Sequence, residues 1–267
     1  MKRIIVTGAT GRMGGRIIAL LKEYPDLQLA GALEKKGGEG IGSDIGTLIG
    51  AGETKVLLSD SLENIIGNGD IVIDFTVPAA TMQNAKIAAE NRKAMVIGTT
   101  GFSKDQIEVL RRLSREIPLV LAPNMSIGVN LLFKVLKDVA RVLGDDYDIE
   151  IIEAHHRMKK DAPSGTALKM AQVIADAVQR NLDEVGVYAR KGIIGERTKQ
   201  EIGIQTIRAG DIVGEHTVLF GGLGERIEIT HKASSRDTFA RGALKASIWA
   251  ADRRPGLYDM QDVLDLK

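Results

Sequence analysis

Residues 153–167 read EAHHRMKKDAPSGTA and concentrate side chains that can transfer protons and bind anions. Two of the four histidines of the chain are adjacent here, at His155 and His156, and an arginine and two lysines follow them. Imidazole titrates near neutrality, so it can give or take a proton during a reaction. We consider three interpretations of this segment: a metal site, a solvated charged turn, and a site for an anionic substrate.

The metal interpretation lacks ligands. Adjacent residues on a strand point to opposite faces, so His155 and His156 cannot share a metal without a kink. The other two histidines, His216 and His231, stand alone in the sequence, and the chain has no cysteine. We therefore expect no metal site.

The small residues that follow the cations favour an anion site over a plain surface turn. Ser164, Gly165 and Thr166 lie at the start of a helical pattern over 165–179. Their hydroxyl and backbone N–H groups can bind a carboxylate at the N-terminus of that helix, and Lys159 is a second candidate proton donor beside His155. A small dianion suits this arrangement.

A second candidate site lies at the start of the chain, where VTGATGRMGG places Gly8, Gly11 and Gly14 between a strand and a helix. Glycines allow a phosphate to approach the backbone, and the helix N-terminus supplies N–H groups. Glu34 ends the next strand, and such a carboxylate can accept hydrogen bonds from a ribose diol. This context favours a dinucleotide site over a tight turn without a ligand.

The cofactor preference stays open at this point. Glu34 favours the 2′-hydroxyl of NADH, whereas the lysines at 35 and 36 either hold the 2′-phosphate of NADPH or form a solvated turn. Two further strand ends, GTTG at 98–101 and APNMS at 122–126, carry small residues that would let a nicotinamide and its ribose lie against the backbone.

The predicted strands and helices that carry these residues follow two different patterns along the chain. Short apolar runs at 3–8, 27–33, 70–76, 94–100 and 118–124 alternate with helical patterns at 15–23, 79–92 and 103–115, and a glycine-rich long loop is expected at 36–54. This predicts a Rossmann-type, doubly wound parallel sheet.

After about residue 126 the regular alternation of strands and helices ends. Helices are expected at 130–143 and 165–179, with strands at 147–156, 202–210, 215–222 and 225–233, and a last helix at 236–251 precedes a terminal tail. The close spacing of the later strands predicts a second α+β domain with an antiparallel or mixed sheet.

Composition narrows the class of protein. The 36 Lys and Arg residues nearly balance the 35 Asp and Glu residues, which argues against broad binding to nucleic acid. The missing cysteines exclude disulfides and a thiol nucleophile. The first apolar run is too short for a signal peptide, and no apolar stretch is long enough to span a membrane. We therefore expect a soluble cytoplasmic protein without a nucleic-acid or membrane partner.

The motifs GATGRMG, IDFT, VIGTTGF, EAHHRMKKDAPSGTA, RAGDIVGEHTV and ERIEITHKASSR occur in this order along almost the whole chain. Together they resemble the 4-hydroxy-tetrahydrodipicolinate reductase family, also called dihydrodipicolinate reductase, of bacterial lysine and diaminopimelate biosynthesis. The resemblance implies a dinucleotide-binding domain over 1–126 and 237–267, to which the last helix returns. It also implies a substrate-binding and oligomerisation domain over 127–236 that builds a homotetramer.

The same resemblance implies NADH or NADPH as reductant and a small cyclic dicarboxylate as substrate, with hydride delivered to the ring and water lost overall. It implies that His155 is a proton donor or acceptor, that Lys159 is a proton donor, and that His156, Gly165 and Thr166 bind substrate. The implied cofactor contacts are Gly8, Ala9, Thr10, Gly11, Arg12, Met13, Glu34, Lys35, Gly98, Thr99, Thr100, Ala122, Pro123, Asn124 and Met125.

The chain departs from the family pattern at three places. Met158 stands where the family often has a third histidine, so that position cannot titrate here. Lys35 replaces a frequent arginine and lacks the planar guanidinium that can stack on adenine. The family motif A-A-N-F reads A-P-N-M at 122–125, which removes an aromatic ring.

Two other functions fit the sequence less well. Short-chain dehydrogenases also open with spaced glycines, but none of the four tyrosines here has the required lysine four residues later. A non-catalytic sensor of a nicotinamide cofactor would not need the cationic cluster at 155–160.

Overall fold

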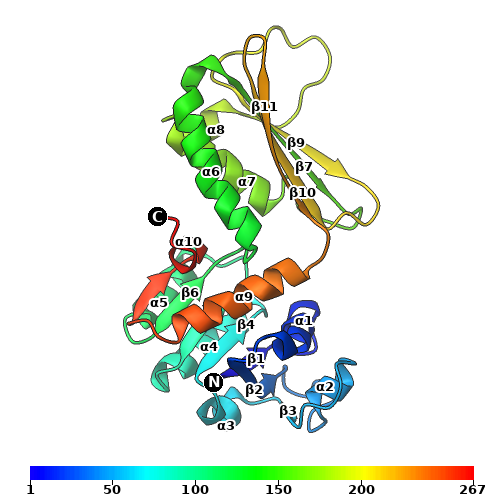
Figure 1. Ribbon diagram of the computed structural model, residues 1–267, viewed down its shortest axis with the longest axis vertical. Helices are drawn as coiled ribbons and strands as arrows, with labels where there is room; N and C mark the ends of the chain where they lie inside the picture. The colour runs from blue at the N-terminus through cyan, green and yellow to red at the C-terminus, as the bar shows by residue number, and fades with distance from the viewer. The chain divides into compact units, whose positions relative to one another are not determined.

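The chain divides into two units in the computed structural model, which describes residues 1–267 (Figure 1). The first unit comprises Met1–Ile127 and Arg236–Lys267, and the second comprises Gly128–Ser235. The chain therefore leaves the first unit and returns to it at Arg236, where the helix predicted at 236–251 begins. None of the helices combines the length and the apolar character needed to cross a membrane.

The first unit is built on a parallel sheet of seven strands in the order β12-β6-β5-β4-β1-β2-β3. Runs of β-branched and other apolar residues form its centre, and every residue of β4 and β5 is buried. The strands are β1 Lys2–Thr7, β2 Leu27–Leu33, β3 Leu58–Ser59, β4 Ile71–Asp74, β5 Ala94–Ile97, β6 Pro118–Leu121 and β12 Gly256–Tyr258.

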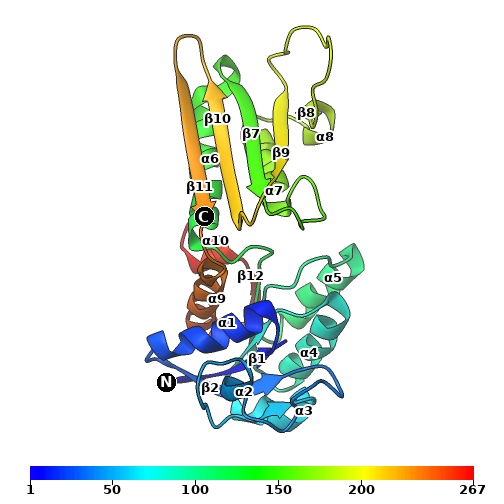
Figure 2. The same ribbon diagram turned by 90° about the vertical axis from the view of Figure 1, so that its right-hand side faces the viewer.

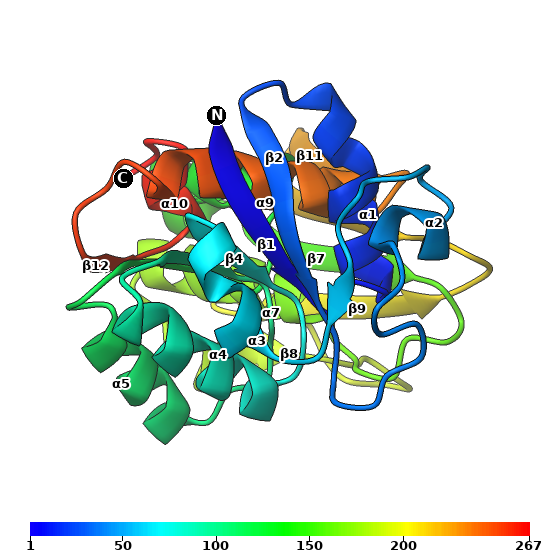
Figure 3. The same cartoon turned by 90° about the horizontal axis from the view of Figure 1, so that it is seen from below.

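Helices cover both faces of this sheet because its side chains alternate between two buried clusters (Figure 3). Ile4 and Val6 of β1 pack with α1 (Arg12–Leu20), α9 (Asp237–Ala250) and α10 (Met260–Val263). Ile5 packs on the other side with α3 (Leu62–Ile65), α4 (Pro78–Glu90) and α5 (Lys104–Leu113). The predicted doubly wound parallel fold is confirmed.

Two expectations for this unit were wrong. The long loop expected at 36–54 contains the one-turn helix α2 (Ile45–Leu48), because the Asp44 carboxylate caps it by accepting a hydrogen bond from Thr47 N at 2.8 Å. The expected terminal tail contains β12, which pairs with β6 at the sheet edge, and then α10. All three elements are too short to give a periodic signal.

The second unit is a mixed sheet of five strands in the order β11-β10-β7-β9-β8. Its central strand β7 (Asp148–His155) pairs parallel with β9 (Ile202–Arg208) and antiparallel with β10 (Gly214–Gly221). The outer strands are β11 (Arg226–Ala233) and β8 (Gly186–Val187).

One face of this second sheet packs against α6 (Ile127–Leu143) and α7 (Gly165–Ala177), and the short α8 (Leu182–Val185) joins the same apolar cluster. Figure 2 shows the strands in front of these helices, with no helix of the unit over their other face. The predicted mixed sheet is confirmed, and the parallel β7–β9 pair is what makes it mixed.

Candidate active site

The face of the second sheet that packs on α6 and α7 changes from apolar to polar along the strands. On β7, Ile149 and Ile151 are buried core residues, and the next two residues on the same face are Glu153 and His155. On the paired strand β9, Ile202 and Ile204 lead in the same way to Thr206 and Arg208. The period of two therefore places polar groups together where α7 begins.

Glu153 is the centre of this polar cluster and has no exposed surface. Its carboxylate accepts hydrogen bonds from His155 Nδ1 at 2.5 Å, from both terminal nitrogens of Arg208 at 2.8 Å, from Ser164 N at 3.0 Å and from Thr206 Oγ1 at 3.2 Å. Arg208 balances its charge, and these donors hold the pKa of Glu153 below its usual value although burial opposes them.

His155 ends β7 and is 9% exposed. Burial lowers the pKa of its imidazole, while the hydrogen bond and charge of Glu153 act in the opposite direction. Because Glu153 occupies Nδ1, the ring nitrogen left for proton transfer is Nε2. A Cβ on Gly214 would lie 3.1 Å from that Nε2, so the glycine leaves room beside it.

The ring of His216 packs against that of His155, with the two ring centroids 5.2 Å apart in an edge-to-face arrangement. Its Nε2 is 3.1 Å from Ser164 Oγ, and burial lowers the pKa of His216 to about 4. Ser164 in turn caps α7 by accepting a hydrogen bond from Ala167 N at 3.1 Å. The N-terminus of α7 is thus fixed to β10 and, through Glu153, to β7.

The three cations expected around the histidines differ in their exposure to solvent. Lys159 is half-buried and its Nζ donates to both carboxylate oxygens of Asp161, at 2.7 and 2.8 Å. Arg157 and Lys160 are exposed, as is Met158 at 77%. Lys159 is therefore the residue of the three that the fold brings beside the cluster.

The remaining substrate residues of the prediction lie next to it. His156 follows β7, and its backbone N–H donates to Ile212 O at 2.8 Å. Gly165 and Thr166 form the first turn of α7. A Cβ built on Gly165 would meet no heavy atom within 4 Å, so the space beside the helix N-terminus is open for an anion.

The glycine turn of the first unit fits a dinucleotide phosphate. Gly8 has a φ of +67°, a conformation that favours glycine, and joins β1 to α1. A Cβ on Gly14 would lie 2.1 Å from Gly8 O, so only glycine permits this close packing of helix and turn. The N-cap Gly11 provides no side chain, and the first turn of α1 has no acidic residue, which leaves the helix N-terminus suited to an anion.

Glu34 follows β2 and is held against the same turn. Its Oε1 accepts hydrogen bonds from Thr10 N at 3.1 Å and from Thr10 Oγ1 at 2.8 Å. Its Oε2 accepts from Lys35 N at 3.2 Å. The carboxylate is thus oriented beside the phosphate-binding glycines, where a ribose diol of a dinucleotide would lie.

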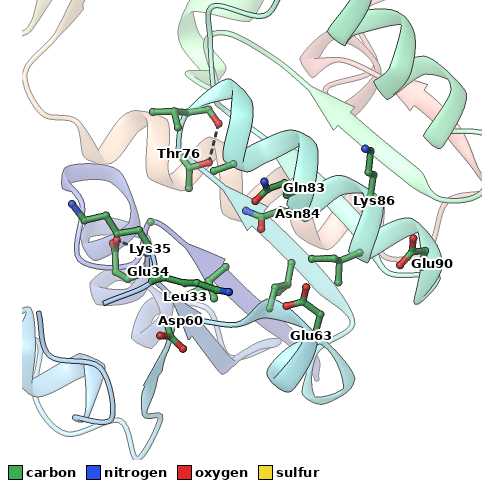
Figure 4. A pocket seen from close by; sticks show the side chains of 16 residues that line it. Leu33, Glu34, Lys35, Asp60, Glu63, Thr76, Gln83, Asn84, Lys86 and Glu90 are labelled. Atoms are coloured by element: carbon green, nitrogen blue, oxygen red, sulfur yellow. Dashed lines mark hydrogen bonds between the residues drawn. The ribbon is translucent and has the colours of Figure 1, made fainter. Parts of the chain in front are cut away.

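A groove of about 780 Å³ extends from this carboxylate to α4 (Figure 4). Of the predicted cofactor residues, Gly8, Glu34 and Lys35 line it, while Gln83 and Lys86 lie on the α4 side. Apolar side chains, among them those of leucines 33 and 62, give it surface for a purine ring.

The other predicted cofactor residues follow β5 and β6 at the same edge of the sheet but do not line this groove. Thr99 is buried, and its Oγ1 lies 3.0 Å from the carboxylate of Asp74. Met125 is also buried, in the core cluster that contains α9. At these two positions, only backbone atoms are left to contact a cofactor. Gly98, Thr100, Pro123 and Asn124 belong to the same two turns.

Sequence reasoning missed several polar residues of both units. Glu153 gave a local signal, because residues two apart on a strand share a face with His155. No local sequence signal points to Arg208 or His216, since only the pairing of β9 and β10 with β7 brings them close to His155. Asp74 ends β4 and accepts hydrogen bonds from three threonine hydroxyls and from Asn84.

A turn that fits a dinucleotide in one unit and a proton-transfer cluster with an open helix N-terminus in the other define the class of nicotinamide-dependent oxidoreductases. Comparison with known proteins agrees. Residues 2–125 match the model of the dihydrodipicolinate reductase N-terminus, and residues 128–264 match that of its C-terminus. The chain belongs to the dihydrodipicolinate reductase family, and so it is a pyridine-nucleotide-dependent reductase.

Individual relatives cover the whole chain. It is 57% identical over 267 residues to the 4-hydroxy-tetrahydrodipicolinate reductase of Syntrophus aciditrophicus, covering 100% of both chains. It is 56% identical to that of Desulfotalea psychrophila, covering 100% of this chain and 99% of the relative. A dipicolinate-bound dihydrodipicolinate reductase from a Paenisporosarcina species superposes with a TM-score of 0.77 at 25% identity, covering 98% of each chain.

Proposed function

We propose that the protein reduces 4-hydroxy-tetrahydrodipicolinate, or its dehydrated form dihydrodipicolinate, to tetrahydrodipicolinate in lysine and diaminopimelate biosynthesis. The observation that carries this proposal is the cluster around Glu153, which joins His155 to the start of α7 and lies near enough to Lys159 for that ammonium to influence the imidazole. The names of the relatives at 57% and 56% identity support the same substrate.

In this proposal the second unit binds the two carboxylates of the ring. Gly165 and Thr166 offer the N-terminus of α7 to one carboxylate, and His156 contacts the substrate beside it. Reduction of the ring takes up one proton with the hydride, and Nε2 of His155 and Nζ of Lys159 are the two candidate donors of that proton. The substrate carboxylate would compete with Asp161 for the Lys159 ammonium.

The cofactor supplies the hydride when it is bound. Gly8, Ala9, Thr10, Gly11, Arg12 and Met13 would hold its diphosphate, and the turns at 98–100 and 122–125 would hold its nicotinamide half. Glu34 would accept the hydroxyls of the adenosine ribose, and Lys35 and Lys36 would pair with a 2′-phosphate. We propose that NADH and NADPH are both accepted, because the Glu34 carboxylate and the ammonium groups of Lys35 and Lys36 line the same groove.

Steady-state reduction of the freshly prepared cyclic substrate with NADH and NADPH in parallel tests the activity. Turnover with both is expected, and a protein that oxidises neither cofactor in the presence of this substrate would refute the proposal. His155→Ala should lose turnover with unchanged cofactor binding, because the two sites lie on different units. That result separates the enzyme from a sensor that only binds the cofactor.

The assembly and its location belong to the same proposal. A cytoplasmic homotetramer is proposed on the resemblance to the family, and the sheet of the second unit offers a face that no helix of that unit covers. Ile207 of β9 lies on that face, opposite Ala154 of β7, and is 46% exposed, and burying such a side chain stabilises association. The molar mass of the full chain in solution, measured by light scattering, tests this assembly. Four times the mass of one chain is expected.

A further inference from the structure

Glu153 is fully buried, and the mechanism proposed above assigns it no role. Its carboxylate joins three elements: β7 through His155, β9 through Thr206 and Arg208, and the start of α7 through Ser164. A buried carboxylate with this many donors has one orientation only, so every group bonded to it is oriented as well.

The two oxygens of this carboxylate have different partners. Oε2 accepts from His155 Nδ1 and from one terminal nitrogen of Arg208. Oε1 accepts from the Ser164 backbone N–H, from Thr206 Oγ1 and from the other terminal nitrogen of Arg208. One oxygen thus holds the proton-transfer residue and the other holds the loop that leads to Gly165 and Thr166.

We propose that Glu153 is a positioning residue that keeps the His155 proton on Nδ1, so that Nε2 faces the reaction, and that fixes this ring to the carboxylate-binding turn of α7. The inference rests on the proposed function, because it assigns the proton transfer to His155. It extends that function by naming the residue that sets the tautomer of the ring.

An amide at this position would reverse the tautomer. At the position of Oε1, the NH2 group of Glu153→Gln would face three donors, from Ser164, Thr206 and Arg208. At the position of Oε2 it would face a single fixed donor, from Arg208, because Nδ1 of His155 can become an acceptor. It would replace Oε2 and donate to Nδ1, so the neutral His155 ring would carry its proton on Nε2. The ring would lose its carboxylate partner, so its pKa would fall and less of it would carry the proton that it must donate.

The charged and titratable groups around His155 come from every strand of the cluster. Glu153 lies on the same strand, Arg208 on β9, His216 on β10 and Lys159 on the loop before α7. Arg208, Lys159 and a protonated His216 all disfavour the imidazolium, so Glu153 is the only group of the four that favours it. Removing its charge therefore moves the loss of activity with rising pH to lower pH.

The tautomer can be read in the full-length protein by NMR of 15N-labelled histidine, with the His155→Ala spectrum assigning the resonance among the four histidines. In the wild type at alkaline pH, the Nδ1–H form is expected. In Glu153→Gln, the Nε2–H form is expected, with kcat lower by about 100-fold or more and the KM for the cofactor unchanged.

Glu150→Gln is the matched control. Glu150 lies on the same strand and accepts hydrogen bonds from Arg190 and Arg197, but it contacts no histidine. Its replacement is expected to leave the tautomer of His155, the pH profile and kcat as in the wild type. If Glu153 had only a structural role, Glu153→Gln would lower the melting temperature but leave the tautomer of His155 unchanged.

The Nε2–H form in the wild type would overturn the inference, and so would a Glu153→Gln protein with wild-type tautomer and kcat. If Glu153→Gln does not fold, the wild-type tautomer alone decides. A wild type that shows the Nδ1–H form but reduces no cyclic substrate would refute the proposed function while the orientation of His155 by Glu153 stands.

Discussion

The pH dependence of stability should carry the signature of His216. This side chain lies on β10 opposite Glu153 in the strand register and is 4% exposed. Its Nε2 is bonded to Ser164 Oγ, whereas its buried Nδ1 has no partner, so protonation would add an N–H group with nothing to bond. Burial accordingly lowers its pKa from 6.5 to about 4.

The sign of the effect follows from the protons bound in each state. Between pH 6.5 and about pH 4 the unfolded chain protonates this histidine and the folded chain does not, so acidification lowers the free energy of unfolding. Each pH unit costs roughly 1.4 kcal/mol, which gives about 3 kcal/mol over the whole window. Above this window the contribution to pH dependence vanishes, because both states hold a neutral ring.

His216→Gln removes the titration and keeps an amide near the position of Nε2, where it can bond to Ser164 Oγ. At about pH 8 the variant should be less stable than the wild type, since it lacks the ring packing on His155. This difference should shrink by about 3 kcal/mol on acidification to about pH 4, because only the wild type then loses the histidine contribution.

The assay must report on the second unit. Trp249 is the only tryptophan and lies in α9 of the first unit, so its fluorescence reports unfolding of that unit and not of the unit that contains His216. Hydrogen exchange of the β10 amides, measured in both proteins across the pH range, gives the local free energy of opening. Parallel pH curves for wild type and His216→Gln would refute the reasoning, because the buried histidine would then titrate normally.

Three further predictions concern single side chains. Gly14→Ala should destabilise the first unit by about 2 kcal/mol or more, since its Cβ would clash with Gly8 O, whereas Gly15→Ala, whose nearest neighbour would be 3.6 Å away, should be tolerated in thermal melts. Gly165→Ala should change stability by less than about 0.5 kcal/mol but raise the substrate KM about tenfold, because its methyl group enters open space at the α7 N-terminus. Glu34→Gln should shift the ratio of kcat/KM values about tenfold toward NADPH, through the lost charge beside the ribose.

Each of these has a result that contradicts it. Equal melting temperatures for Gly14→Ala and Gly15→Ala would show that the glycine turn adapts to a side chain. An unchanged KM in Gly165→Ala would remove the α7 N-terminus from the substrate site. An unchanged cofactor ratio in Glu34→Gln would place the ribose away from that carboxylate.

Most of the fold could be predicted because its strong elements carry local signals. The strand 27–33 was predicted with the bounds that β2 has, and the helices α4, α5 and α7 differ from their predicted bounds by at most two residues at either end. Elements of two to four residues, such as β12 and α2, were missed, since no periodicity fits within so few positions. They form through pairing with β6 and through the Asp44 cap.

The candidate site divides in the same way. The residue pattern alone was enough to find the glycine turn at 8–14, the acidic residue at 34 and the run from His155 to Thr166, because each lies within one strand–loop–helix segment whose chemistry is local. Which cation lies at the cluster became clear only in the folded chain, where Lys159 is half-buried beside it and Arg157 is exposed to solvent.

The tertiary structure also decided what holds the reactive histidine. Glu153, Arg208 and His216 are up to 63 residues apart in the sequence and meet through the registers of β7 with β9 and of β7 with β10. Register between distant strands is set by burying the apolar face of the whole sheet, which no single segment encodes. The adjacent histidines that mark the site are visible in the sequence, but the buried carboxylate that orients one of them becomes significant only in the folded sheet.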